Sequence, residues 1–96
     1  MQKNYSKVVG ATFRERLPLN EIQEFTELLQ GGSYWVGIGN HISKMQVTVD
    51  REEGYLEMLI KTTTNFSRGD YMYKVTATNE YGDTLVLVHG RIRFYG

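Results

Sequence analysis

The two histidines are the residues of this chain best suited to acid–base chemistry. His41 lies in an expected Gly-Asn-His turn, and His89 lies in an expected strand. General acid–base and nucleophilic catalysis need a base within hydrogen-bond reach of its partner and a further group that orients the base. No local motif around either histidine supplies such a partner. We therefore expect no catalytic residues and no cofactor, and a non-catalytic role is favoured over an enzymatic one.

The other motifs of the chain do not indicate metal or nucleotide chemistry. Because cysteine is absent, disulfide bonds, thiolate metal sites and cysteine catalysis are excluded. The acidic turn Asp50–Gly54 lacks the alternating oxygen ligands of a calcium loop, so no metal site is expected. The glycines form no phosphate loop and no Gly-x-Gly-x-x-Gly motif. Arg68-Gly69-Asp70 spells the integrin-binding tripeptide, but the same residues suit an ordinary turn.

Length and composition predict one domain spanning residues 1–96. A chain of this length supports one hydrophobic core, and 41% hydrophobic with 23% charged residues is typical of globular proteins. The 11 basic residues balance the 11 acidic ones, so no bulk charge indicates nucleic acid or membrane as a partner. No apolar run is long enough to span a membrane, and the first residues lack a signal sequence. We therefore expect a soluble protein, with the cytoplasm favoured.

One helix is expected, over residues 20–30. Asn20 is a good N-cap, and Gln23 stands where a capping box needs its second member. The glycines at 31 and 32 favour the end of the helix, since glycine adopts the left-handed conformation common at helix ends. The apolar positions that recur at helical spacing are Leu19, Ile22, Phe25 (or Thr26), Leu28 and Leu29.

The rest of the chain alternates as strands do. One strand is expected before the helix, over residues 5–14, and five follow it, over residues 33–39, 42–50, 55–64, 71–78 and 85–94. Short turns favour antiparallel pairing of successive strands. The sequence therefore predicts an α+β fold, with one N-terminal helix packed on a curved antiparallel sheet of five to six strands. Residues 85–88 are apolar on both faces of the last strand, so the pattern does not decide which face packs inward.

About half of the chain resembles the intermediate-set immunoglobulin domains. The matching residues are Trp35, Gly39 and Ile42, which fit the spacing of a Trp, a Gly and an apolar residue in this family, and Leu56, Met58 and Ile60, which resemble its fifth strand. The Tyr73–Gly82 segment is similar to the Tyr-x-Cys-x-Ala-x-Asn-x-x-Gly pattern of its sixth strand. Val75 stands where the family has its cysteine, and the helical pattern at 20–30 does not fit such a sandwich. The resemblance implies an all-β immunoglobulin-like sandwich as the alternative fold.

The face of the sheet opposite the expected core is unusually apolar and basic. A face in water should be polar, and a large apolar patch on a monomer usually marks an interface. We therefore predict a binding domain that self-associates, as a homodimer, or recognises a protein partner through this face. Its expected centre is Trp35, Leu59, Met72, Leu85 and Leu87, and its rim is Lys61, Lys74, Arg91 and Arg93.

Two alternative functions remain open. The first is a small-ligand pocket between helix and sheet, lined by Tyr34, Met45, Met58, Tyr71 and Tyr73. The second is binding of single-stranded nucleic acid, in which basic side chains would neutralise the backbone and aromatic rings would stack on bases. The residues of this second site share one face and are Lys44, Lys61, Lys74, Arg91, Arg93, Trp35 and Tyr55.

Overall fold

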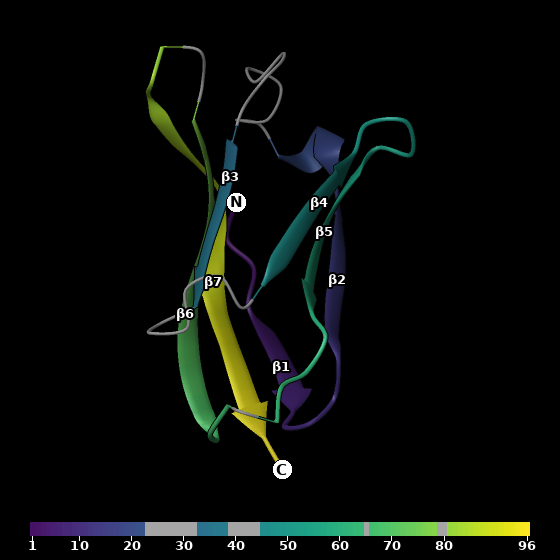
Figure 1. Ribbon diagram of the computed structural model, residues 1–96, viewed down its shortest axis with the longest axis vertical. Coiled ribbons are helices and arrows are strands. Elements are labelled where there is room, and N and C mark those ends of the chain that lie inside the picture. Colours follow the sequence, from purple (N-terminus) through teal and green to yellow (C-terminus); the bar gives the residue numbers. More distant parts are fainter. Residues whose placement is uncertain (23–32, 39–44, 65, 79–80) are drawn as a thin grey trace.

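The computed structural model describes residues 1–22, 45–64, 66–78 and 81–96, and the backbone of residues 33–38. Two sheets face each other in this part of the chain (Figure 1). One sheet has the strand order β1-β7-β6-β3, and the other has the order β2-β5-β4. The strands are β1 (Tyr5–Val8), β2 (Phe13–Pro18), β3 (Ser33–Ile38), β4 (Gln46–Asp50), β5 (Tyr55–Ile60), β6 (Gly69–Thr78) and β7 (Thr84–Tyr95). None of the described residues belongs to a helix long and apolar enough to cross a membrane.

The predicted α+β fold is wrong, because the core lies between two sheets and not between a helix and a sheet. Residues 23–32, which include most of the expected helix, lie outside the described residues. Its expected start is instead a 3-10 turn, η1 (Leu19–Glu21), after which Ile22 is extended, with φ −98° and ψ 94°. The apolar residues at 19 and 22 therefore both contact the core without forming a long helix, with Ile22 fully buried and Leu19 partly buried.

The topology matches the alternative expectation, an all-β immunoglobulin-like sandwich. In constant-type immunoglobulin domains the second, fifth and fourth strands share a sheet, and the third, sixth and seventh form the other. The same strands are grouped here, while β1 pairs in parallel with β7. Val75, which stands in place of the family's cysteine, is fully buried in the core. Gly39 and Ile42 of the resemblance lie outside the described residues.

The expected strand over residues 5–14 is two strands that belong to different sheets. Gly10, with φ +96°, lies in the turn between them. Thr63 fixes this crossing: its hydroxyl accepts from the Gly10 N–H at 2.8 Å and donates to the Ala11 carbonyl at 2.6 Å. Thr63 is fully buried and follows the end of β5, so it does not extend that strand as expected. Alternation continues through the crossing because both strands face the same core.

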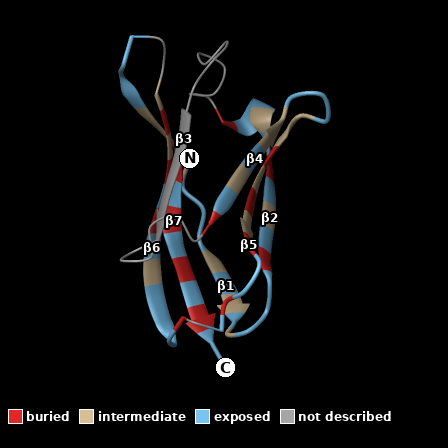
Figure 2. Ribbon diagram, viewed as in Figure 1, coloured by how far each residue is buried: buried red, intermediate tan, exposed pale blue. Residues whose placement is uncertain are grey.

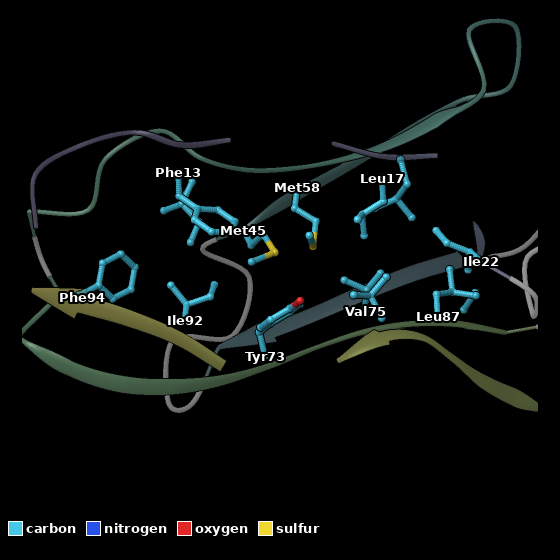
Figure 3. Close-up of a cluster of buried hydrophobic side chains, with 14 of the residues drawn as sticks. Phe13, Leu17, Ile22, Met45, Met58, Tyr73, Val75, Leu87, Ile92 and Phe94 are labelled. Atoms are coloured by element: carbon cyan, nitrogen blue, oxygen red, sulfur yellow. The ribbon is translucent and has the colours of Figure 1, made fainter. Parts of the chain in front are cut away.

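The core fills the space between the two sheets. In Figure 3, Phe13, Leu17 and Met58 project toward Tyr73, Val75 and Ile92 of the facing sheet. Figure 2 shows how buried and exposed residues alternate along β7, as a strand between core and solvent requires. The aromatic end of the core is formed by Phe66, Tyr71 and Phe94, with Phe66 stacked on Phe94 at a ring-centroid distance of 4.8 Å.

A bulge in β7 explains why residues 85–88 are apolar on both faces. Val75 pairs with Val88, but the next residue of β6, Thr76, pairs with Val86. Leu87 is therefore an extra residue in β7, and both Leu87 and Val88 are fully buried. The bulge reverses the inward parity of the strand at this point.

Residues 1–4 run beside β7 and continue the line of β1. The Lys3 N–H donates to the His89 carbonyl, and the His89 N–H donates to the Met1 carbonyl, both at 2.9 Å. A Cβ at Gly90 would collide with the Lys3 carbonyl oxygen, so this close approach requires glycine. The Lys3 carbonyl accepts from the Tyr73 hydroxyl at 2.7 Å, while the Arg91 N–H donates to Oδ1 of Asn4 at 3.0 Å.

Candidate interaction surface

The predicted interface residues lie on two opposite outer faces of the sandwich. Leu59 is on the outer side of β5, and Lys61 follows that strand. A second set lies on the outer side of the four-stranded sheet, and we call its surface the β6–β7 face. It comprises Val8, Asp70, Met72, Lys74, His89, Arg91, Arg93 and Tyr95, all of them exposed. Four of the predicted residues, Met72, Lys74, Arg91 and Arg93, therefore lie together.

The predicted centre of the interface requires correction. Leu87 is fully buried by the bulge, and Leu85 is partly buried against the core, so neither is a centre of an exposed face. The Trp35 side chain lies outside the described structure, although its backbone pairs with Thr76. The β6–β7 face is defined by which residues pair across β6 and β7. Alternation along the sequence alone does not give this set correctly, because the bulge reverses which residues of β7 face inward.

Cross-strand pairs set the geometry of the β6–β7 face. Asp70 lies opposite Arg93, and its Oδ1 accepts from the Arg93 Nε at 2.8 Å. The other carboxylate oxygen is 3.4 Å from a terminal nitrogen of Arg93 and 3.8 Å from one of Arg91. The hydrogen bond from Arg93 lowers the pKa of Asp70 below its usual value and keeps it ionised. Gly69 and Asp70 of the Arg68-Gly69-Asp70 segment therefore belong to β6 and not to the expected turn, and the Asp70 carboxylate is already bound within the sheet.

Apolar side chains on the same face are unusually open to solvent. Among the described residues, four large hydrophobic side chains are exposed, and three lie here: Met72 at 66%, Tyr95 at 49% and Val8 at 44%. Tyr95 and Val8 are direct neighbours across β7 and β1. The fourth, Tyr81, lies in the turn between β6 and β7. Methionine, tyrosine and arginine are enriched in protein interfaces, so this combination is typical of a contact surface.

A hollow of about 230 Å³ lies on the β6–β7 face where residues 2–4 run beside β7. Its lining residues are Gln2, Asn4, Met72, His89, Gly90 and Arg91. Because the Arg91 N–H binds Oδ1 of Asn4, the orientation of this carboxamide is fixed and its NH₂ group is left for other partners. The lining residues therefore include several side chains that can donate hydrogen bonds and one thioether, but no carboxylate.

The outer side of the other sheet, which we call the β2–β5–β4 face, has a half-buried carboxylate, Glu57, that two arginines share. Glu57 lies 3.0 Å from Nε of Arg14 and 3.8 Å from Nε of Arg16. The Arg16 guanidinium also lies 4.4 Å from the centre of the Tyr55 ring. The Tyr55 ring is therefore in contact with Arg16 of the same face, and Glu57 forms ion pairs with Arg14 and Arg16.

The nucleic-acid alternative is not supported by this arrangement. Tyr55 and Lys61 belong to the β5 side of the sandwich, whereas Lys74, Arg91 and Arg93 lie on the opposite face. The predicted basic and aromatic residues therefore do not form one surface. Lys44 and His41 lie outside the described residues.

The small-ligand alternative is likewise not supported, because its residues fill the core. Met45, Met58 and Tyr73 are buried, and Tyr71 packs partly buried against them. Burial raises the pKa of the Tyr73 hydroxyl, which is committed to the Lys3 carbonyl. Tyr34 contributes only its backbone to the described structure. Within the described ranges, no three histidine or acidic side chains come together as a metal site would require.

Comparison with known proteins supports the fold. No family model and no curated protein matches the chain. Among solved structures, the crystal structure of InlP from Listeria monocytogenes superposes with a TM-score of 0.61 and 18% sequence identity. The match covers 97% of this chain and 26% of InlP, so the chain spans about a quarter of that protein. At this identity the likeness is one of fold.

Proposed function

We propose that this protein is a non-catalytic binding module that recognises a protein partner, another copy of the chain or a different protein, through the β6–β7 face. The observation that carries the proposal is the exposure of Met72, Tyr95 and Val8 beside the guanidinium groups of Arg91 and Arg93. Apolar groups open to water gain free energy when a partner covers them, and adjacent cations add orientation.

The scaffold under this face favours binding because its two central strands are paired along most of their length. β6 and β7 pair over ten positions, and the inward-facing residues of both strands are fixed in the core. Met72 lies directly opposite Arg91, and Lys74 opposite His89, so the spacing of the side chains is set by the ladder. A surface whose backbone is already ordered loses little entropy on binding.

Selection from an unbiased peptide display library, followed by mapping of the selected peptides by NMR, tests the proposal. We expect the selected peptides to shift the backbone amides of Met72, Lys74 and Arg91, and to bind Met72→Asp at least about tenfold more weakly. Gln46→Asp is the matched control, since Gln46 is exposed on the β2–β5–β4 face opposite Leu59. Peptides that bind elsewhere, or bind Met72→Asp as well as the parent, would contradict the proposal.

Sedimentation velocity separates the two kinds of partner. If the partner is a second copy, the parent chain should associate as its concentration rises and Met72→Asp should remain monomeric. A parent chain that stays monomeric throughout removes the self-association version and leaves recognition of a different protein.

A further inference from the structure

We infer that the partner presents an acidic segment, and that one of its carboxylates is bound by the Arg91 guanidinium in the hollow of the β6–β7 face. The inference rests on the proposed function and specifies the chemistry of the partner. Three observations support it: the excess of cations on the face, the residues that line the hollow, and the like charges that a two-fold dimer through this face would bring together.

The β6–β7 face carries more cations than its own anion can neutralise. Asp70 is the one carboxylate among the described residues of this face, and Arg93 takes its closest contacts, at 2.8 and 3.4 Å. Arg91 is left with a single contact at 3.8 Å. Lys74 has no ion pair with any residue in the described part of the chain. Most of the guanidinium donors of Arg91 are therefore available to a second carboxylate, which they can bind as a fork.

The hollow beside Arg91 has the size and lining for one acidic side chain. Its volume of about 230 Å³ is below the range of about 300–1,000 Å³ typical of small-molecule sites. Gln2, Asn4 and His89 add polar groups that can donate, and Met72 forms an apolar wall. A cationic side chain would meet the like charge of Arg91 there, so the lining discriminates in favour of an anion.

The same charges disfavour a symmetric dimer built on this face. A two-fold interface places the same patch on both subunits, so Arg91, Arg93 and Lys74 of one copy would face those of the other. Such like-charge contacts weaken association. An acidic partner segment instead brings the missing carboxylates and can cover Met72 with an apolar neighbour.

Short probe peptides test the inference with the full chain. The acidic probe is a capped peptide with glutamates on both sides of a central leucine, and its counterparts carry glutamine or lysine in place of glutamate. In an NMR titration we expect the acidic probe to shift the amides of Gln2, Asn4, Met72 and Arg91. The glutamine probe should bind at least about fivefold more weakly, and added salt should weaken the acidic probe.

Two arginine variants localise the effect. Arg91→Gln should weaken the acidic probe about tenfold, whereas Arg91→Lys, which keeps the charge but loses the fork, should give a smaller loss. Arg14→Gln is the matched control, because Arg14 is also paired with a carboxylate and lies on the β2–β5–β4 face. The acidic probe should bind this variant like the parent.

The outcomes distinguish this inference from the proposed function. Equal binding of the glutamate and glutamine probes at the β6–β7 face overturns the acidic preference while the face remains a binding surface. Acidic-probe binding that is unchanged in Arg91→Gln, or no shift on the face with any probe, also overturns the inference. The proposed function is then judged by the display selection, which assumes no charge.

Discussion

The two outer faces of the sandwich carry similar residues but use their charges differently. On the β2–β5–β4 face, the side chain of Glu57 is only 16% exposed and lies between Arg14 and Arg16. On the β6–β7 face, the side chain of Asp70 is 40% exposed and is bound mainly by Arg93. The arginines of both faces are about half exposed, so the faces differ in how deeply the carboxylate that two arginines share is buried.

Aromatic and apolar groups differ between the faces in the same way. Arg16 covers Tyr55 on one face, whereas Tyr95 and Met72 of the other face are about half exposed or more. Residue composition alone would rank the two faces equally. The difference shows that an interaction surface is recognised by what its groups leave unsatisfied, and not by which residue types it contains.

Leu87→Asp should have the largest effect on stability, and comparing it with Met72→Asp distinguishes core residues from residues of the exposed β6–β7 face. Leu87 is fully buried, so the variant places a charge in the core and should lower the free energy of unfolding by about 4 kcal/mol or more. Denaturant unfolding followed by fluorescence measures this. Met72→Asp, on the exposed face, should change stability by no more than about 0.5 kcal/mol. A stable Leu87→Asp protein would show that the bulge is placed wrongly.

Gly90→Ala tests whether the hollow depends on the close approach of Lys3. A Cβ at position 90 would collide with the Lys3 carbonyl, which is backbone and cannot rotate away. We expect the N-terminal segment to be displaced, with a loss of about 3 kcal/mol in unfolding free energy. Hydrogen exchange should then speed up at Lys3 and His89, whose amides bond across this seam.

Residues of the β2–β5–β4 face provide the control for Gly90→Ala. The amides of Glu57 and Leu59 lie in the other sheet and should keep their relative protection. If protection falls equally on both sheets, Gly90 stabilises the whole fold and does not act on the β6–β7 face in particular.

Much of the strand content could be predicted from the sequence, but the way the strands share a core could not. Alternation located β6 closely, because the strand has one face in the core and one outside, but it extended β5 too far, through the buried Thr63. The same alternation joined β1 to β2, since a strand that crosses to the facing sheet still points inward. A period of two does not reveal which sheet a strand belongs to.

The candidate site was predicted in part for a related reason. Met72, Lys74, Arg91 and Arg93 were grouped correctly because β6 and β7 pair directly. Leu59 was added to the wrong face because parity counted from a single sheet cannot distinguish two outer surfaces. The contribution of Gln2 and Asn4 to the hollow had no signal in the sequence, since it depends on a backbone contact with Gly90.

Glu57→Gln should lower the free energy of unfolding moderately, and Asp70→Asn should lower it less. Removing the Glu57 charge leaves Arg14 and Arg16 without their shared anion at a mostly buried position, so we expect a loss of about 1 kcal/mol. Thermal unfolding at low and at high salt measures it, and the loss should shrink with salt. A larger loss in Asp70→Asn than in Glu57→Gln would reverse the contrast between the faces.

The smallest expected effect is the pH dependence of the Asp70 pair. The hydrogen bond from Arg93 lowers the pKa of Asp70 in the folded chain, so this pair stabilises the fold above the unfolded pKa of about 3.9. The contribution is lost as the pH falls through the lower, folded pKa. The stability difference between the parent and Asp70→Asn should therefore be small at neutral pH and vanish in acid. NMR titration of the Asp70 carboxyl carbon gives the folded pKa directly. A pKa at or above the usual value would mean that Arg93 is not held by Asp70, and the β6–β7 face would then offer the guanidinium groups of both Arg91 and Arg93 to a partner.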